Sequence, residues 1–219
     1  CSIGGCLEHG IDLSRSYDNW IIDNEIGSNR GAAIYAISDT YAEKLPEPRF
    51  AHAQKPEEGT DPSRVASWGC AATTITACRL EWNKLGGLVL HDSESVQANG
   101  CSLDHNFGPG VMLMNCKAMT VTGCLFRSNG ADRLDDMSCH LRMEGSKGVS
   151  VTGNAMYGAF GRSEHQFIAP TPFYGMVTRD LEAGVITANA MYQSASKQGI
   201  LDYGGHNHST ISNNSYTEP

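Results

Sequence analysis

Residues 121–126 read Val-Thr-Gly-Cys-Leu-Phe, and residues 151–156 read Val-Thr-Gly-Asn-Ala-Met. Both follow one pattern: an apolar residue, two small or polar residues, Asn or Cys, any residue, and a large apolar residue. The pattern recurs at 21–26, 75–80, 98–103, 186–191 and 211–216. Its fourth position falls at 24, 78, 101, 124, 154, 189 and 214, so successive copies are 54, 23, 23, 30, 35 and 25 residues apart.

A second pattern, usually Gly followed by apolar-x-apolar, runs in parallel with the first. It starts at residues 10, 87, 110, 140, 175 and 199, with His in place of Gly at 140. From residue 87 its copies are 23, 30, 35 and 24 residues apart, so both patterns share one period that insertions lengthen at the same places. A period in the twenties with short alternating strands is typical of a β-solenoid, whose coils stack at about 4.8 Å.

The Asn or Cys position predicts a ladder at one corner of the coils. An Asn there can bond backbone groups of its own turn and of the next coil, and Cys fits the same inward pocket as a small apolar residue. The ladder accounts for Cys78, Cys101 and Cys124 among the eight cysteines, and Cys116 is also expected to point inward. Buried free thiols are therefore predicted, and disulfides between coils are less favoured. Zinc is not supported, because no Cys-x-x-Cys or matching His pair occurs.

Composition narrows the classes of function. The 219 residues carry a formal charge of −8 and are 40% hydrophobic and 18% charged, with 24 glycines, which favours turn-rich β structure. The acidic balance argues against sequence-blind nucleic-acid binding. No apolar run approaches the roughly 20 residues that cross a bilayer, so neither nucleic acid nor membrane is an expected partner.

The Val-Thr-Gly-Asn/Cys-x-Phe/Met pattern resembles the right-handed parallel β-helix superfamily, the pectate-lyase-like fold, over nearly the whole sequence. The resemblance implies an all-β, single-stranded right-handed parallel β-helix of about seven coils with loop insertions, forming one domain over 1–219. It also implies a carbohydrate-active, bacterial protein that is secreted or periplasmic. The corner pattern and the large loops are similar to those of inulin fructotransferases. The four motifs of the polygalacturonases are missing: Asn-Thr-Asp, Gly-Asp-Asp, Gly-His-Gly and Arg-Ile-Lys.

The N-terminal residues already read as mid-coil sequence, without an amphipathic segment that could cap the stack. An uncapped end exposes backbone groups and apolar side chains. We therefore expect the chain to be part of a longer protein, or another segment to cover its first coil.

Three insertions interrupt the repeat, and insertions of a solenoid commonly form its binding face. A long inserted loop spans 37–73 and holds four of the eight prolines. Residues 127–139 and 157–174 precede the Gly-apolar-x-apolar strand in successive coils. They are expected to be neighbouring cleft loops.

Outward positions of that strand predict a site beside these loops. Glu144 and Arg179 fall on adjacent rungs, and Arg142 lies two residues from Glu144 on the same face. A carboxylate flanked by guanidiniums could serve acid/base catalysis and bind a substrate carboxylate; the alternative is a surface ion-pair ladder. The same outward column contains His91 and Tyr203, which are assigned to substrate binding.

Each of the other candidate site residues could instead have a purely structural role. Glu164 and His165 form an acid/base pair or a plain polar loop. Asp104 and His105, in a short corner, present an acid or base at the cleft or form a solvated turn. Aromatic rings could stack on sugars or pack at coil edges; these are Trp82, Phe107 and Tyr203.

Metal binding has one candidate. Three aspartates of the 127–139 insertion could coordinate Ca²⁺ or form a solvated loop: Asp132, Asp135 and Asp136. No cofactor is certain from the sequence, and Ca²⁺ is the one it suggests.

Two enzymatic mechanisms and one non-enzymatic role stay open for a poly- or oligosaccharide ligand. Hydrolysis or glycosyl transfer would pair Glu144 with Asp135 or Glu164. β-Elimination of a uronate polymer would use Arg142, Arg179 and His165, with the aspartate cluster, although the acidic net charge slightly disfavours a polyanion. The alternative is a non-enzymatic β-helical adhesin, tail fibre or carbohydrate-binding protein, which predicts a homotrimer or a repetitive surface without convergent ionisable groups.

Overall fold

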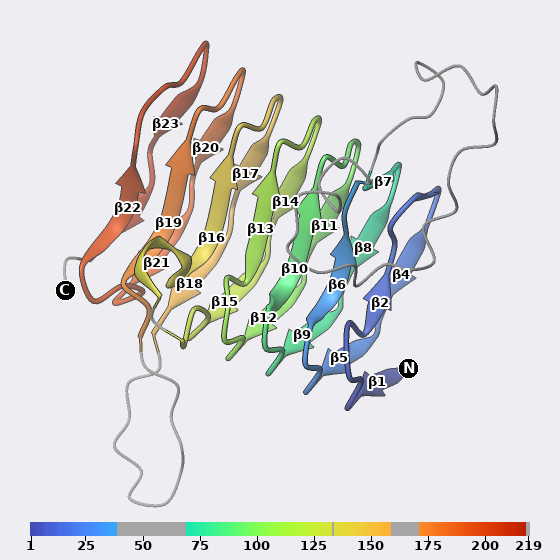
Figure 1. Cartoon of the computed structure of the whole chain (residues 1–219). Helices are drawn as coiled ribbons and strands as arrows, with labels where there is room; N and C mark the ends of the chain where they lie inside the picture. The colour runs from blue at the N-terminus through green and yellow to red at the C-terminus, as the bar shows by residue number, and fades with distance from the viewer. Residues whose placement is uncertain (39–68, 133, 159–170, 218–219) are drawn as a thin grey trace, which may run out of the picture.

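The computed structural model describes residues 1–38, 69–132, 134–158 and 171–217. These residues wind into a solenoid whose coils stack in chain order from the N-terminus to the C-terminus (Figure 1). Every strand pairing in the described residues is parallel, and three long sheets run along the stack. The predicted all-β parallel β-helix is confirmed.

The first sheet carries the last two positions of the repeat pattern. Its middle residues, such as Leu80, Leu103 and Phe126, pair in register on successive rungs and are almost fully buried. Its eight described strands are β1 (Ser2–Gly4), β5 (Glu25–Gly27), β9 (Arg79–Glu81), β12 (Ser102–Asp104), β15 (Leu125–Arg127), β18 (Ala155–Tyr157), β21 (Ala190–Tyr192) and β24 (Ser215–Tyr216).

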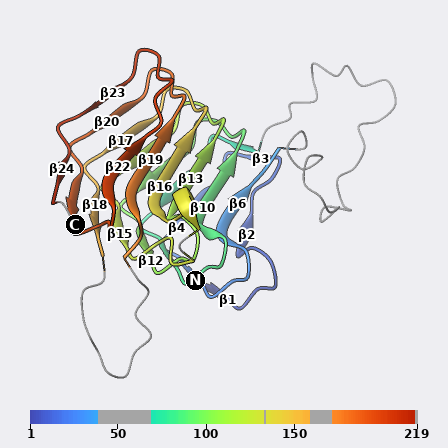
Figure 2. The same cartoon turned by 60° about the vertical axis from the view of Figure 1, so that its left-hand side comes forward.

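The second sheet carries the Gly-apolar-x-apolar pattern, and its strands lie side by side in Figure 2. Alternate residues point into the core, where Leu88, Val111 and Leu141 stack on three successive rungs. Its seven described strands are β2 (Ile11–Asp12), β6 (Ala32–Ala36), β10 (Gly86–His91), β13 (Val111–Met114), β16 (Cys139–Glu144), β19 (Tyr174–Arg179) and β22 (Gln198–Asp202).

The third sheet carries the first positions of the repeat pattern, with Thr or another polar residue on both sides of a buried apolar residue in most strands. Its seven described strands are β4 (Trp20–Ile22), β8 (Thr74–Thr76), β11 (Gln97–Asn99), β14 (Thr120–Thr122), β17 (Ser150–Thr152), β20 (Val185–Thr187) and β23 (Thr210–Ser212). Two shorter strands pair at another corner, β3 (Ser16–Tyr17) and β7 (Cys70–Ala71), and η1 (Asp135–Met137) is a single 3₁₀ turn. Within the described residues, no helix has both the length and the apolar composition that crossing a bilayer requires.

The predicted Asn/Cys ladder is confirmed by its hydrogen bonds. The Cys101 amide donates to Cys124 Sγ at 3.4 Å, and the Cys124 amide donates to Asn154 Oδ1 at 2.9 Å. The Asn154 side-chain amide donates to Asn189 Oδ1 at 2.9 Å, which continues the ladder into the next coil. Each side chain thereby satisfies backbone groups that the bend would otherwise bury without a partner.

The buried thiols are also confirmed. All eight cysteines are free, and six of them are buried: Cys70, Cys78, Cys101, Cys116, Cys124 and Cys139. Burial raises the pKa of the Cys116 thiol to about 12, because a charged thiolate is poorly solvated inside the core. These cysteines therefore behave as small core residues.

A second asparagine ladder at the corner between the first and second sheets was not predicted. The side-chain amide of Asn29 donates to Asn83 at 2.9 Å, Asn83 to Asn106 at 3.0 Å, and Asn106 to Asn129 at 2.8 Å. These positions are 54, 23 and 23 residues apart, the same intervals that identified the first ladder. The signal was therefore present in the sequence.

The second ladder ends on a histidine. The Asn129 side-chain nitrogen lies 3.3 Å from His140 Nδ1, and His140 is fully buried. Burial lowers the pKa of His140 to about 3, so the imidazole is neutral at ordinary pH.

Candidate functional site

The outward face of the second sheet brings together the residues that the sequence selected. Glu144 of β16 pairs in register with Arg179 of β19, and Arg142 pairs with Val177, so the predicted rungs are confirmed. Glu144 Oε1 lies 3.5 Å from Arg179 Nη1, and Glu144 Oε2 lies 2.9 Å from Arg142 Nη2. The carboxylate is thus held between two guanidiniums.

A second carboxylate reaches the same place from η1. Asp136 Oδ1 lies 2.7 Å from Arg142 Nη1, so one guanidinium binds Asp136 and Glu144 through its two terminal nitrogens. Asp135, the residue proposed from sequence, begins the turn, and its backbone carbonyl accepts the Ser138 amide at 3.1 Å. The structure therefore places Asp136 beside Glu144.

Tyr203 completes the arrangement. The Arg179 guanidinium lies 4.1 Å from the centre of the Tyr203 ring, and Tyr203 hydrogen-bonds to Asp136. Partial desolvation and the Asp136 carboxylate raise the pKa of the phenol. We call these five side chains the ion-pair ring: Asp136, Arg142, Glu144, Arg179 and Tyr203.

Exposure increases across the ion-pair ring. The side chain of Arg142 is 11% exposed, Glu144 is 26% exposed and Arg179 is 36% exposed. Tyr203, on the far side of Arg179, is 48% exposed. The ring therefore has a buried end at Arg142 and an open end at Arg179 and Tyr203, where a ligand can approach.

The 127–139 insertion is fixed at several points, which positions Asp136. Asp132 forms an ion pair of 2.8 Å with Lys84, whose Nζ lies 4.5 Å from the centre of the Phe107 ring. The Asp132 amide also donates to the Phe107 carbonyl at 3.0 Å. Met137 packs against an outward apolar cluster on the second sheet that includes Val89 and Met112.

The acidic insertion does not fit a Ca²⁺ site. Asp132 is bound to Lys84 and Asp136 to Arg142, so the carboxylates are directed to separate cations. Among the described residues, no group of three or more His, Cys, Asp or Glu side chains is placed to hold a metal ion.

His91 lies on the column of Glu144 but is buried. Its side chain belongs to β10 and is two rungs from Glu144, with Met114 between them in register. Only 6% of His91 is exposed, and burial lowers its pKa to about 4. The residue is therefore a neutral imidazole within the protein.

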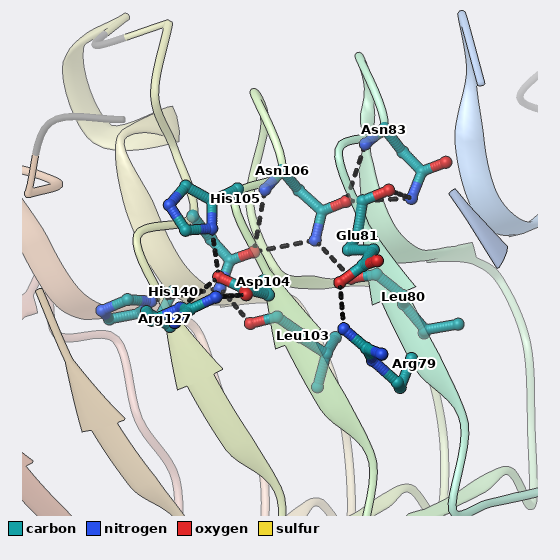
Figure 3. A network of polar contacts seen from close by, with 11 residues as sticks. Arg79, Leu80, Glu81, Asn83, Leu103, Asp104, His105, Asn106, Arg127 and His140 are labelled. Atoms are coloured by element: carbon teal, nitrogen blue, oxygen red, sulfur yellow. Dashed lines mark hydrogen bonds and ion pairs between the residues drawn. The ribbon is translucent and has the colours of Figure 1, made fainter. Parts of the chain in front are cut away.

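Asp104, His105 and Trp82 form a separate group at the corner that follows the first sheet. Asp104 accepts a hydrogen bond of 2.7 Å from Arg127 Nε, with a closer contact to Arg127 Nη2, and its other neighbour is His105 Nδ1 (Figure 3). Although burial opposes it, hydrogen bonds from His105 and Arg127 lower the pKa of Asp104. The Trp82 ring stacks on His105 with 4.4 Å between centroids and an 11° angle between planes.

Two proposed site residues cannot be placed. Glu164 and His165 lie outside the described residues, as do residues 39–68 of the long inserted loop. The ion-pair ring is therefore built from β16, η1, β19 and the residue after β22. Within it, the described chain brings together two carboxylates, two guanidiniums and a phenol.

Two solved structures share this fold, and a third is less similar. The A-module of a mannuronan C-5 epimerase of Azotobacter vinelandii has a TM-score of 0.61 and 15% identity, covering 97% of this chain and 49% of the module. A surface adhesin of Streptococcus pneumoniae has a TM-score of 0.50 and 9% identity, covering 95% and 60%. A DFA-IIIase of Arthrobacter chlorophenolicus A6 has a TM-score of 0.47 and 12% identity, covering 90% and 39%. The chain thus spans about half the length of the epimerase module.

No curated protein matches the sequence at a significant level. A family model described as a right-handed beta helix region matches residues 63–219, which is more than half of the chain. With its parallel sheets and its corner ladders, the chain belongs to the right-handed β-helix family.

Proposed function

We propose that the protein binds an extended glycan along the outward face of the second sheet and processes it by hydrolysis or glycosyl transfer at the ion-pair ring. One observation carries the proposal: Arg142 holds Asp136 and Glu144 side by side on the two terminal nitrogens of one guanidinium. Glycosidases and related transferases use two carboxylates about 5 to 9 Å apart around the glycosidic bond. Two carboxylates on one guanidinium are close enough together to serve in this way.

The neighbours of each carboxylate suggest a division of roles. Glu144 accepts contacts from two guanidiniums and offers negative charge to an oxocarbenium-like transition state, as a nucleophile or base does. Asp136 lies beside the Tyr203 phenol, whose pKa is raised by desolvation and by the Asp136 carboxylate. We assign Asp136 to proton delivery toward the leaving oxygen: the bound glycan displaces it from Arg142, the carboxylate takes up a proton from water, and it passes this proton to the leaving oxygen beside the Tyr203 phenol. Asp136 takes the place that the sequence hypothesis gave to Asp135 or Glu164.

Charge and fold support a glycan as the ligand. The two arginines and two carboxylates of the ion-pair ring cancel in formal charge, and the chain as a whole carries −8, so an uncharged glycan fits better than a polyanion. Rungs about 4.8 Å apart form a long, repetitive surface that suits an extended polymer. The epimerase module that shares the fold is named for a polysaccharide, mannuronan, which supports a polysaccharide ligand in general and not its uncharged form.

Two alternatives make different predictions. In β-elimination, a substrate carboxylate would replace Glu144 on Arg179, the most exposed cation of the ring, and His165 would be a candidate base. In a non-enzymatic adhesin, the ring would only stabilise the surface; the observation in its favour is that the ring's charges are paired with one another. Both alternatives are outcomes of the experiment below.

The test is a screen of the protein against fructans, neutral glucans and uronate polymers, with chain length, reducing ends and ultraviolet-absorbing unsaturated ends measured together. We expect cleavage or transfer on a neutral glycan, and a loss of about 10²- to 10⁴-fold in kcat for Glu144→Gln. Glu182→Gln is the matched control, because Glu182 forms a surface ion pair of 2.6 Å with Lys147 outside the ring. Full activity of Glu144→Gln would remove Glu144 from the site, unsaturated products would support elimination, and binding without turnover would support the adhesin.

A further inference from the structure

A column of side chains at the corner after the first sheet is built on a strict backbone ladder. The Ser28 amide donates to the Glu81 carbonyl at 3.1 Å, the Trp82 amide to Asp104 at 3.1 Å, and the His105 amide to Arg127 at 2.9 Å. Ser28, Trp82 and His105 therefore occupy equivalent positions on three successive rungs. All three have positive φ, between 51° and 59°.

Trp82 is the exceptional member of this column. A bulky residue with φ of 59° is rare and signals strain or function, and the equivalent position one rung earlier carries the small Ser28. Trp82 is the largest side chain among the described non-glycine residues with positive φ. The same left-handed conformation recurs at Ser28 and His105, so it belongs to the corner of the coil, and Trp82 is the position where that corner carries a large aromatic side chain.

The two faces of the indole have different surroundings. One face stacks on the His105 imidazole at 4.4 Å. The other face is directed along the column toward the previous rung, where Ser28 and Gly27 offer almost no side chain. Trp82 is half-buried, and we call the place beside its second face, where the preceding rung has only Gly27 and the small Ser28, the step.

Polar groups border this step. Glu81 pairs in register with Gly27 and forms an ion pair of 2.9 Å with Arg79. On the other side of the platform, Arg127 is bound to Asp104 and remains 41% exposed. Each guanidinium is matched by a carboxylate, so the corner offers hydrogen-bond donors and acceptors without net formal charge.

We propose that this corner is a second sugar-binding site that takes one uncharged sugar ring. We call it the tryptophan corner and define it by Gly27, Ser28, Arg79, Glu81, Trp82 and His105. The apolar face of a sugar ring stacks on the side of the indole opposite His105, and its hydroxyls bond to Glu81 and Arg79. The proposal shares its ligand class with the proposed function but uses a different face of the solenoid, because the ion-pair ring lies on the second sheet.

The first test follows Trp82 directly. The chain has three tryptophans, so Trp20→Phe with Trp68→Phe leaves Trp82 as the only indole. Titration of this variant with fructan, β-glucan and mannan oligosaccharides is expected to give a saturable change in emission for at least one of them. The absence of any change across the panel would overturn the proposal.

The second test measures affinity by calorimetry with the oligosaccharide selected by the titration. Trp82→Ala is expected to weaken binding about 10-fold, the loss of an aromatic stack. Trp20→Ala is the matched control, because Trp20 is 76% exposed on the third sheet and is expected to leave affinity unchanged. Circular dichroism and the unfolding midpoint of both variants show whether the fold is retained, and unchanged affinity in a folded Trp82→Ala protein would refute the site.

Failure of this proposal can be told apart from failure of the proposed function. Glu144→Gln is expected to lose turnover while the Trp82 emission change persists with the same dissociation constant. If Glu144→Gln keeps full activity but Trp82→Ala loses affinity, the tryptophan corner stands and the assignment of the ion-pair ring fails. If Glu144→Gln loses activity but Trp82→Ala keeps its affinity, the assignment of the ion-pair ring stands and the tryptophan corner is refuted.

Discussion

The guanidinium of Arg142 has Nη1 2.7 Å from Asp136 and Nη2 2.9 Å from Glu144, and its side chain is 11% exposed. Two carboxylates this close repel each other unless a cation lies between them. A planar guanidinium binds both at once, whereas the ammonium of a lysine is a point charge that cannot hold two partners in a fixed plane. At the scale of single residues, Arg142 is therefore the positioning residue of the ring.

The buried histidines give the molecule a pH dependence. Burial lowers the pKa of His91 to about 4 and that of His140 to about 3, below the value of about 6.5 expected in the unfolded chain. The unfolded state therefore binds more protons between these values, so this contribution to stability is present above pH 6.5 and is lost as the pH falls. We expect the free energy of unfolding to fall by up to about 1.4 kcal/mol per pH unit for each histidine between pH 6 and 4.5.

Denaturant unfolding at pH 7.5, 6 and 5 measures this slope. His140→Gln should flatten the slope even if it lowers stability at every pH, because it removes one titrating group. His208→Gln is the control, since His208 is exposed, and should leave the slope unchanged. A free energy of unfolding that is constant between pH 7.5 and 5 would contradict the assignment of neutral, buried imidazoles.

The ring shows how far the sequence could predict a site. The register of Glu144, Arg142 and Arg179 followed from the repeat, because successive copies place equivalent residues on adjacent rungs. The sequence could not single out Asp136 among the neighbouring aspartates, because the 3₁₀ turn η1 decides which of them faces the sheet. The turn begins at Asp135, whose φ is 41°, and the repeat pattern does not predict this conformation. Insertions do not repeat, so periodicity carries no information about them.

At the scale of the ladder, Asn and Cys should be partly interchangeable. Asn154 is buried, accepts the Cys124 amide at 2.9 Å and donates to the Val121 carbonyl at 2.9 Å. Asn154→Ala leaves both groups without a partner, at about 1–3 kcal/mol each. In Asn154→Cys, the sulfur can accept the Cys124 amide as Cys124 Sγ itself accepts the Cys101 amide at 3.4 Å, so the loss should be clearly smaller.

Chemical denaturation of the two variants beside the parent protein gives the comparison. Ala and Cys are both smaller than Asn, so both variants lose side-chain volume. The difference in unfolding free energy between the two variants therefore mainly measures the hydrogen bonds of the sulfur. Equal destabilisation by Asn154→Ala and Asn154→Cys would mean that sulfur does not substitute for the amide in the ladder.

The elements themselves were largely predictable, because each strand combines an inward apolar residue with a corner residue of fixed type. The first ladder was found because its column holds only Asn or Cys, with three cysteines between asparagines, beside strong apolar positions. The second ladder, at Asn29, Asn83, Asn106 and Asn129, was missed although its intervals are the same. Its flanking residues vary more, since the corner it occupies also carries the 127–139 insertion, and a search for equal intervals of a single residue type would have found it.

At the scale of the molecule, the stack produces one thin, continuous core that runs through the coils. The main hydrophobic cluster extends from Leu13 to Met191, and residues such as Ile3, Ile200 and Ile211 near the two ends of the described stack are only partly buried. In a solenoid, each coil is stabilised mainly by its two neighbours. The end coils are therefore expected to open more readily than the central ones.

The reactivity of the cysteine thiols can be used to compare how readily the end coils and the central coils open. Cys1 is exposed and Cys6 is half-buried, whereas the other six thiols are buried along the stack. A thiol reagent attacks the thiolate, and burial both blocks access and raises the pKa, as for Cys70 and Cys116. We expect two of the eight thiols to react quickly in the native protein and all eight in denaturant.

Mass spectrometry after timed labelling identifies which cysteine has reacted. Cys124 is the critical case, because a hydrogen bond with Cys101 lowers its pKa and would favour reaction, whereas its side chain is only 1% exposed. If burial decides reactivity, Cys124 is labelled only when the central coils open, together with Cys101 and Cys116. Fast labelling of Cys124 in the native protein would instead mean that the centre of the stack opens locally, and that the core is less continuous than its packing indicates.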